Sequence, residues 1–490
     1  MKDRLLRYVK SDRHFWWTVS ALPGIYALTY LYQKNFNLVH SWEQLIGLSF
    51  WFIVLPSLGM IIIHHLVKRY ASKHLSKLYF SFFLIFTASV VSLIVFMGWR
   101  WKALLLLSAL ILGASFFLSK YYKILVILLG LMTCLVTVQF TFFYITNIAS
   151  QEDWVDDEIF NNIRFQKKPN IYVIQPDGYA GGAALQDATY NFDNSDFTKI
   201  MKMDGFKFNK NFRSNYTSTL TSNASMFTGQ HHYFNAGKMK GELYKARDII
   251  IGKNPVLDTF INNGYQTNFI SETTYFYTSF AGSVYDYSNL DEISIPYFPF
   301  FRTDIDYLDA FKKRLKKNLD TADPQFYFIQ VLKPGHISTL KRSTTGKIEE
   351  RMAYLDRLES MNDQIKIMTD FITESDPLAI VIIAADHGGF VGMDYTGQLH
   401  DGILDDRDDL KCSSFNSLFM YKAPQKFEPY AGAINSSISI FPNLFAFLSD
   451  THPVSDLDES SYTYILDKDV TKVKKYYDTH GNPVEEFLAD

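Results

Sequence analysis

Two short segments of the chain place acidic and imidazole side chains just after apolar runs. Asp177-Gly178 comes after the run Ile171–Gln175, and Asp386-His387-Gly388-Gly389 comes after the run Ala379–Ala385. Carboxylates and an imidazole can bind a divalent metal: Asp and His suit Zn, whereas oxygen-rich sets suit Mn, Mg or Ca. A lone Asp in such a place more often caps a helix. The Asp-His pair is more specific, so the two segments together indicate a metal site.

A third segment, residues 213–229, is crowded with hydroxyl side chains and ends in Thr228-Gly229. The pattern predicts a helix that starts among the hydroxyls and stops at the glycine. The free N–H groups and positive dipole end of a helix N-terminus suit a phosphoryl group. A hydroxyl bound to a metal there can be activated as a nucleophile. Taken by itself, the segment is better explained as a Ser/Thr-rich N-cap, which is the simpler interpretation.

The elements that must position these segments are strands buried on both faces. Ile171–Gln175, Phe326–Val331 and Ala379–Ala385 are nearly continuous apolar runs, typical of buried parallel strands. Between the last two, apolar residues at helical spacing predict a long helix with one core-facing stripe, made of Ile348, Met352, Leu355, Leu358, Met361, Ile365 and Met368. Alternating strands and helices predict an α/β layered domain. Ligand sites in such sheets form beyond the carboxyl ends of the strands.

The first 148 residues have a different composition from the rest. They hold 14 Lys and Arg and three acids, whereas residues 149–490 hold 34 and 48, so the net charge of −3 is a cancellation. The averages still exclude a disordered chain, a collagen or a disulfide-rich miniprotein. Five apolar stretches approach the roughly 20 residues that a membrane-spanning helix needs; they lie near 15–33, 45–67, 79–98, 103–118 and 124–147.

The distribution of basic residues predicts the orientation of these spans. Residues 1–14, 68–78 and 119–123 carry eleven Lys and Arg, and the alternate loops carry three. By the positive-inside rule the N-terminus is inside and the C-terminal half outside, and no cleavable signal peptide is expected. We therefore expect a transmembrane domain at 1–148, an acidic connector at 149–168 and an extracytoplasmic domain at 169–490. An acidic outer domain is not expected to bind nucleic acid.

The order of these motifs resembles the alkaline phosphatase superfamily in its sulfatase-like branch. The shared order is a strand ending in Asp, a hydroxyl nucleophile before Thr-Gly, a Pro-x-His segment, and a strand ending in Asp-His-Gly. The resemblance covers about residues 168–450. With five spans in front, the chain looks like the lipoteichoic acid synthases and the lipid A phosphoethanolamine transferases. It implies an α/β/α sandwich with a central, mainly parallel sheet.

The resemblance also implies roles for six residues. The metal ligands would be Asp177, Thr219, Asp386 and His387, with Thr219 also the nucleophile. His336, in Lys333-Pro-Gly-His336, matches the substrate-binding His of the family. His400, in Gln398-Leu-His400, matches a His of the transferases. These two histidines would bind the oxygens of the transferred group or protonate the leaving oxygen; for His400, a place in a surface loop is an equal alternative.

The sequence departs from the family pattern at informative positions. Thr219-Leu-Thr221-Ser-Asn223 stands where sulfatases have Cys/Ser-x-Pro-x-Arg, and a threonine cannot give the formylglycine aldehyde, so sulfatase activity is disfavoured. Two-metal relatives have an Asp where this chain has Leu332, which favours one divalent ion, Zn or Mn before Mg or Ca. Gln175-Pro176-Asp177 replaces an acidic pair, and Gly335 is inserted between Pro and His.

The function that follows is a membrane-bound, metal-dependent transferase of a bacterial inner membrane, with a periplasmic or extracellular catalytic domain. It would move phosphoethanolamine or phosphoglycerol from a phospholipid donor through a Thr-linked intermediate. The acceptor would be an envelope glycan or lipid. Two alternatives remain: a phosphodiesterase or phosphatase with the same site, and a non-catalytic membrane scaffold.

Overall fold

The computed structural model divides the chain into two compact units. One unit comprises Met1–Ser150 with Thr278–Phe280 and Ile295–Phe300, and the other comprises Gln151–Tyr277, Ala281–Ser294 and Phe301–Asp490. The structure describes residues 7–11, 13–96, 98–151, 153–233, 243–295, 297–298, 301–319, 321–467 and 470–488. Part of the basic N-terminal segment, including Lys2 and Arg4, lies outside the described residues.

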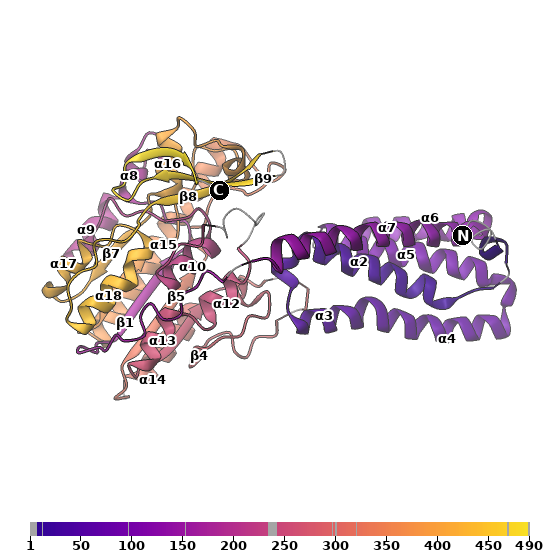
Figure 1. Cartoon of the computed structure of the whole chain (residues 1–490), viewed down its shortest axis with the longest axis horizontal. Coiled ribbons are helices and arrows are strands. Elements are labelled where there is room, and N and C mark those ends of the chain that lie inside the picture. Colours follow the sequence, from indigo (N-terminus) through magenta and orange to yellow (C-terminus); the bar gives the residue numbers. More distant parts are fainter. Residues whose placement is uncertain are drawn as a thin grey trace. The chain divides into compact units, whose positions relative to one another are not determined.

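The first unit is built of apolar helices (Figure 1). In chain order they are α2 (Trp16–Val39), α3 (Trp42–Ser49), α4 (Leu55–Tyr70), α5 (Leu75–Phe96), α6 (Trp101–Leu118) and α7 (Tyr122–Phe143). The short turns η1 (Phe50–Val54), η2 (Ser72–His74), η3 (Ser119–Tyr121) and η4 (Tyr144–Ile148) continue or join them. Many large apolar side chains of α4, α6 and α7 are exposed, among them Leu105, Phe117 and Val138. An outward apolar surface of this kind suits contact with lipid rather than water.

The predicted count of five spans is not confirmed. Within the described residues, three helical stretches are long and apolar enough to cross a membrane: Trp42–Tyr70, Ser72–Phe96 and Trp101–Ile148. The expected spans at 103–118 and 124–147 fall together in the last stretch, where η3 separates α6 from α7. The expected span at 15–33 forms α2, which is not among the three. Its Tyr, Thr, Gln and Asn side chains lower the mean hydropathy of the stretch.

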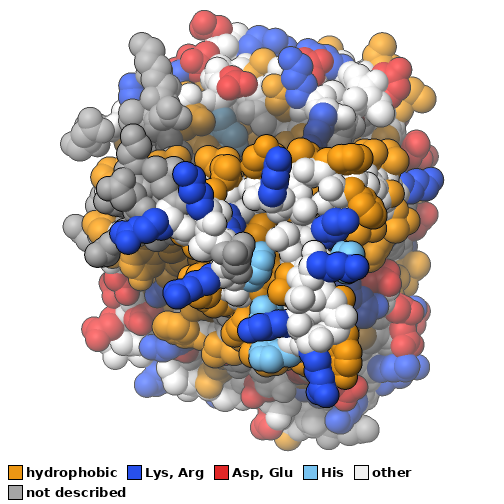
Figure 2. All heavy atoms as spheres, turned by 90° about the vertical axis from the view of Figure 1, so that its right-hand side faces the viewer, with side chains coloured by type: hydrophobic (Ala, Val, Ile, Leu, Met, Phe, Trp, Pro, Cys, Tyr) orange, Lys and Arg blue, Asp and Glu red, His pale blue; other side chains and the backbone are white. Residues whose placement is uncertain are grey.

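Basic side chains gather at one end of this helical unit. Figure 2 shows Lys and Arg distributed around the end where the helices turn. Lys68 and Arg69 lie in the last turn of α4, Lys73 lies in η2, and Lys120 lies in η3. These positions belong to the segments 68–78 and 119–123, which the positive-inside rule predicts to be inside.

The second unit contains a seven-stranded sheet in the order β2-β7-β6-β1-β5-β3-β4 (Figure 1). Strands β6, β1, β5, β3 and β4 are parallel; at one edge β7 pairs antiparallel with β6, and β2 pairs antiparallel with β7. Their bounds are β1 Ile171–Pro176, β2 Lys207–Phe208, β3 Gln266–Ser271, β4 Tyr287–Ser288, β5 Gln325–Val331, β6 Ile380–Ala384 and β7 Phe419–Lys422. The mainly parallel sheet of the α/β prediction is confirmed.

Helices cover both faces of this sheet. Along β1, Tyr172 and Ile174 belong to one apolar core and Ile171 and Val173 to another. The first core is covered by α8 (Gly182–Gln186), α9 (Ser195–Met203), α14 (Tyr307–Asn318), α15 (Lys347–Ser375) and α16 (Asp408–Phe415). The second is covered by α10 (Thr219–Thr228), α12 (Ala246–Ile251), α13 (Pro255–Asn262), α17 (Glu428–Ala431) and α18 (Ile440–Ser449). Burial on both faces explains the continuous apolar runs in the strand sequences.

The predicted stripe on the long helix is wrong at its N-terminal end. Leu355 and the stripe residues after it are buried in α15, but Ile348 and Met352 are 69% and 57% exposed. In these first turns the helix faces the domain with Glu350 and Tyr354 instead, which are buried. Glu350 accepts hydrogen bonds from the backbone N–H groups of Ser338 and Thr345. A polar loop, rather than an apolar layer, therefore covers this end of the helix.

A three-stranded antiparallel sheet, in the order β10-β9-β8, ends the chain. It is formed by β8 (Ser461–Asp467), β9 (Val470–Tyr477) and β10 (Pro483–Phe487). Strand β8 packs against the short helix η6 (Thr396–Asp401), which carries His400. Cys412, the one cysteine of the second unit, is partly buried and free.

Candidate metal centre

Three adjacent parallel strands bring the candidate ligands to one edge of the sheet. Strand β1 lies between β5 and β6, with Pro176 opposite Val331 and Ile174 opposite Ile383. Asp177 directly follows β1, and Asp386 comes two residues after β6. Because parallel strands end at the same edge, segments far apart in the sequence deliver their side chains to one place.

Asp177, Asp386 and His387 form a buried cluster whose ligand atoms all lie within 4.8 Å of one another. The His387 Nε2 atom is 3.7 Å from Asp177 Oδ1 and 3.5 Å from Asp386 Oδ2. Both of these carboxylate oxygens are buried without a hydrogen-bond partner among the described residues. Buried polar atoms are rarely left unpaired, so two orphaned oxygens converging on one imidazole nitrogen fit a bound divalent cation.

The remaining polar atoms of the cluster hold the three side chains in place. Asp386 Oδ1 accepts hydrogen bonds from the backbone N–H groups of Gly178 and His387, at 2.9 and 3.1 Å. His387 Nδ1 lies 2.8 Å from the carbonyl oxygen of Gly388, which requires the proton on Nδ1 and leaves the Nε2 lone pair directed at the cluster. Outer hydrogen bonds of this kind orient metal ligands.

Without a cation, the cluster is electrostatically unfavourable. Burial raises the pKa of Asp177, and burial raises the pKa of Asp386 to about 6. Burial lowers the pKa of His387, but the two carboxylates raise it by more, so the net change is upward. A divalent cation would stabilise the ionised carboxylates and the neutral imidazole, which are the forms that ligate metals.

Thr219 places its hydroxyl against this cluster. It is the first residue of α10, it is 8% exposed, and its Oγ1 donates to Asp177 Oδ2 at 3.1 Å. The same oxygen is 3.4 Å from His387 Nε2. The helix runs to Thr228 and ends at Gly229 with φ of +66°, as the sequence predicts. Ser218, the N-cap residue, makes no capping hydrogen bond with its side chain, and the Thr219 hydroxyl is bonded to the cluster.

His336 lies beside the cluster on the loop that follows β5. Its ring centroid is 5.9 Å from that of His387, and its Nδ1 is 2.6 Å from the carbonyl oxygen of Ile337. Arg357 on α15 holds this loop by donating to the carbonyl oxygens of Pro334 and His336. Burial lowers the pKa of His336 to about 4, and His387 adds to the effect, so the imidazole is neutral at physiological pH.

His400 is held in a different group from the other five candidates. Its ring stacks on Tyr464 of β8 at a centroid distance of 3.9 Å, and its Nδ1 is 3.3 Å from the Tyr464 carbonyl oxygen. Within the part of the chain that the structure describes, no hydrogen bond or ring contact joins it to the cluster. Its role in catalysis stays a prediction from the resemblance.

Sequence reasoning missed one acidic residue at the same edge of the sheet. Glu272 directly follows β3, is 5% exposed and contributes to the raised pKa of Asp177. Its Oε2 is 3.6 Å from Lys333 Nζ, and burial raises its own pKa. As with Asp177 and Asp386, the signal in the sequence was an acidic residue that follows a strand. The strand Gln266–Ser271 is too polar to be recognised as a buried run, because Asn268 and Ser271 are satisfied by hydrogen bonds to neighbouring side chains.

Comparison with known proteins identifies a family and several similar structures. The family model named Sulfatase matches residues 182–446, which is more than half of the chain. No curated protein matches. Among solved structures, the lipooligosaccharide phosphoethanolamine transferase A of Neisseria meningitidis is similar at 12% identity and a TM-score of 0.42, with 88% of this chain and 95% of that one covered. The periplasmic domain of the Campylobacter jejuni phosphoethanolamine transferase EptC matches at 15% identity and a TM-score of 0.35, covering 59% and 91%.

Proposed function

This chain belongs to the sulfatase family, and we propose that it is a metal-dependent transferase of phospho-head groups, anchored in a bacterial inner membrane. Phosphoethanolamine or phosphoglycerol would pass from a phospholipid to an envelope glycan or lipid. The observation that carries the proposal is the pair of orphaned oxygens, Asp177 Oδ1 and Asp386 Oδ2, next to the Thr219 hydroxyl. A threonine nucleophile suits phosphoryl transfer and cannot become the formylglycine that sulfatases use.

Asp177, Asp386, His387 and Thr219 would hold one divalent ion, Zn or Mn before Mg or Ca. When bound, the ion supplies positive charge that stabilises the phosphoryl oxygens and favours the deprotonated hydroxyl. The donor set agrees with a single ion, since one imidazole nitrogen and two orphaned carboxylate oxygens converge there. Leu332, at the place where two-metal relatives carry an acid, supplies no further ligand.

The residues of the chain would carry the two steps of transfer. Thr219 Oγ1, whose hydrogen is directed at Asp177 Oδ2, forms a bond to the phosphorus of the donor. The bond from phosphorus to the diacylglycerol oxygen breaks, and that oxygen leaves with the proton that Thr219 gave up to Asp177; the neutral His336 beside the cluster would carry this proton between them. In the second step an acceptor hydroxyl forms the new bond to phosphorus, and its proton returns to Thr219. The N–H groups at the start of α10 stabilise the transferred oxygens.

The helical unit gives this chemistry a location. Its apolar stretches would anchor the enzyme in the membrane that holds the donor, and the basic ends of α4, η2 and η3 would face the cytoplasm. The catalytic unit would then be periplasmic or extracellular, where phospholipid head groups and envelope glycans are both accessible.

The deciding experiment follows a phospholipid labelled in its head group, incubated with the full-length protein and a divalent ion. We expect a labelled covalent adduct on Thr219, found by mass spectrometry, and label on a glycan or lipid acceptor. Thr219→Ala should abolish both, whereas Thr219→Ser, which keeps a hydroxyl, should retain part of the activity. Activity that survives in Thr219→Ala contradicts the mechanism.

Two other outcomes select the alternatives. Release of the head group into water, with no labelled acceptor, would identify a phosphodiesterase or phosphatase with the same site. Purified protein that binds no stoichiometric divalent ion would favour a non-catalytic scaffold.

A further inference from the structure

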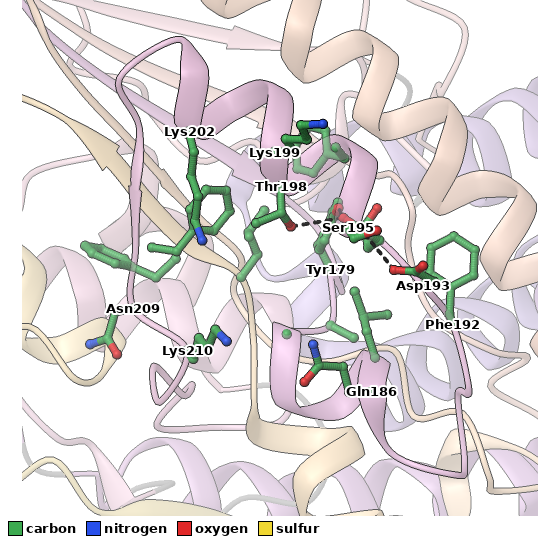
Figure 3. A pocket seen from close by; sticks show the side chains of 18 of the residues that line it. Tyr179, Gln186, Phe192, Asp193, Ser195, Thr198, Lys199, Lys202, Asn209 and Lys210 are labelled. Atoms are coloured by element: carbon green, nitrogen blue, oxygen red, sulfur yellow. Dashed lines mark hydrogen bonds between the residues drawn. The ribbon is translucent and has the colours of Figure 1, made fainter.

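A pocket separate from the metal centre opens between α8, α9, β2 and β7. Its volume is about 540 Å³, within the usual range of about 300–1,000 Å³ for small-ligand sites. The lining begins at Tyr179 and Ala180, just after the ligand Asp177 in the sequence, and includes none of the cluster residues. Figure 3 shows the side chains that line it.

The lining combines an apolar wall with polar side chains. The apolar part is formed by Leu185, Phe192, Phe197, Phe208, Leu418 and Phe419. Phe192 and Phe208 are only partly buried, and the Lys202 ammonium lies 6.0 Å from the centre of the Phe208 ring. The Gln186 amide makes no hydrogen bond within the described residues, and its donors and acceptor remain available. A purely hydrocarbon ligand would bury this amide without a partner, which is unfavourable.

Three lysines give the pocket a positive rim. Lys199, Lys202 and Lys210 line it, and in the part of the chain that the structure describes none of them lies within 4.0 Å of a carboxylate. Figure 3 shows Lys202 and Lys210 extending toward the space between them from opposite sides. Lys207, in the same segment, differs from them because it forms an ion pair with Glu428.

The charge of this rim is unlike that of the surrounding unit. Asp193 is the one acidic residue among the described lining residues, and its Oδ1 already accepts from the backbone N–H of Ser195. Residues 149–490 as a whole carry 48 acids against 34 basic residues. Lysines with no carboxylate partner around a pocket in an acidic unit attract an anion locally while the rest of the surface repels it.

We infer that this pocket binds an anionic glycan. Lys202 and Lys210 bind its phosphate or carboxylate, the rings of Phe192 and Phe208 pack on the apolar faces of its sugars, and Gln186 bonds its hydroxyls. The inference that the pocket binds such a glycan depends only on the residues that line the pocket. That the glycan is the acceptor, held beside the chain segment that carries Asp177, rests on the proposed function.

The test measures binding to the full-length protein in detergent, after EDTA treatment so that the metal centre does not retain phosphate. The probe is maltotriose bearing one phosphate monoester, and the comparisons are plain maltotriose, octyl phosphate and inorganic phosphate, all followed by isothermal titration calorimetry. We expect the phosphorylated trisaccharide to bind most tightly, with an affinity that falls as salt is added.

Matched variants locate the binding. Lys202→Ala with Lys210→Ala should weaken binding at least tenfold, because each lysine contributes a charge-assisted hydrogen bond. Lys316→Ala with Lys317→Ala removes the same charge from exposed positions on α14 and should change nothing. Gly182→Phe should block the pocket, since a Cβ on Gly182 would meet no heavy atom within 4 Å and the ring can occupy open space.

Three results would overturn the inference: unchanged binding in the Lys202/Lys210 variant, tighter binding of octyl phosphate, or equal binding of inorganic phosphate. The second would identify an amphiphile site and the third an adventitious ion only. None of these three results concerns Thr219. If transfer activity persists while the pocket binds no glycan, this inference is wrong and the proposed function is unaffected.

Discussion

Replacing Asp386 by Asn should stabilise the metal-free protein while it removes the response to metal. Burial raises the pKa of Asp386 from its ordinary 3.8 to about 6, so the ionised form is less stable in the fold than in the unfolded chain. Each pKa unit corresponds to about 1.4 kcal/mol, which gives a cost of roughly 3 kcal/mol at neutral pH. An Asn is uncharged and keeps an oxygen for the N–H groups of Gly178 and His387.

The sign of the pH dependence follows from the raised pKa. A carboxyl group whose pKa is raised on folding costs stability at pH above about 6, and the cost disappears as the pH falls toward 3.8. The advantage of Asp386→Asn should therefore be largest at pH 7 and above and small near pH 4. In the presence of metal we expect the wild-type protein to be more stable than Asp386→Asn. Saturating ion stabilises the wild-type protein by about 4 kcal/mol at a thousand times its Kd, and the variant lacks a ligand.

The assay is thermal unfolding of the full-length protein in detergent, at pH 7.5 and pH 5, with EDTA or with added Zn or Mn. We expect the variant to unfold several degrees above the wild type in EDTA at pH 7.5, and only the wild type to gain stability from metal. Asp363→Asn, an exposed acid on α15, serves as the control and should change neither. A variant less stable than the wild type in EDTA at pH 7.5, or equally stabilised by metal, would refute the electrostatic reasoning.

Three further substitutions test other parts of the site. Gly178→Ala places a Cβ 2.3 Å from the carbonyl oxygen of Gly335 at a φ of +64°, so it should lower the thermal unfolding midpoint. The expected loss in the free energy of unfolding is about 1–3 kcal/mol, and Gly182→Ala, which meets no atom within 4 Å, should cause no such loss. His336→Gln should lower kcat by about 10²–10⁴-fold without changing metal content, measured by head-group transfer and metal analysis. Glu272→Gln removes a buried negative charge near the cluster and should weaken metal binding several-fold in a chelator competition, and an unchanged affinity would contradict that effect.

The cluster of Asp177, Asp386 and His387 is the part of the site that the sequence predicts best. Asp177 and Asp386-His387 stand out because the strands before them are buried on both faces and therefore read as unbroken apolar runs. Parallel pairing then places their ends together whatever lies between them in the sequence. The prediction needed local pattern and one topological rule, and no knowledge of side-chain packing.

Features that depend on long-range contacts could not be predicted in this way. Ile348 and Met352 follow the helical spacing of a core stripe, yet they are exposed because the loop bonded to Glu350 covers that end of the helix. Glu272 follows a strand whose polar residues are satisfied only by side chains from other elements. The lysine-rimmed pocket unites α8, α9, β2 and β7, so no single stretch of sequence reveals it.

The inserted glycine of the Pro-Gly-His segment has a structural reason that links the loop of Asp177 to the loop that carries His336. Gly178 follows the proposed ligand Asp177, and the backbone N–H of Gly335 donates to the Asp177 carbonyl oxygen at 2.9 Å. A Cβ on Gly178 would lie 2.3 Å from the carbonyl oxygen of Gly335, so there is no room for a side chain there. Both glycines adopt a positive φ. The same contact places His336 one residue further along, beside His387. Because Gly178 also donates to Asp386 Oδ1, a shift of this backbone would displace both carboxylates and His336 together. The departure from the family spacing is therefore consistent with a maintained site rather than with its decay.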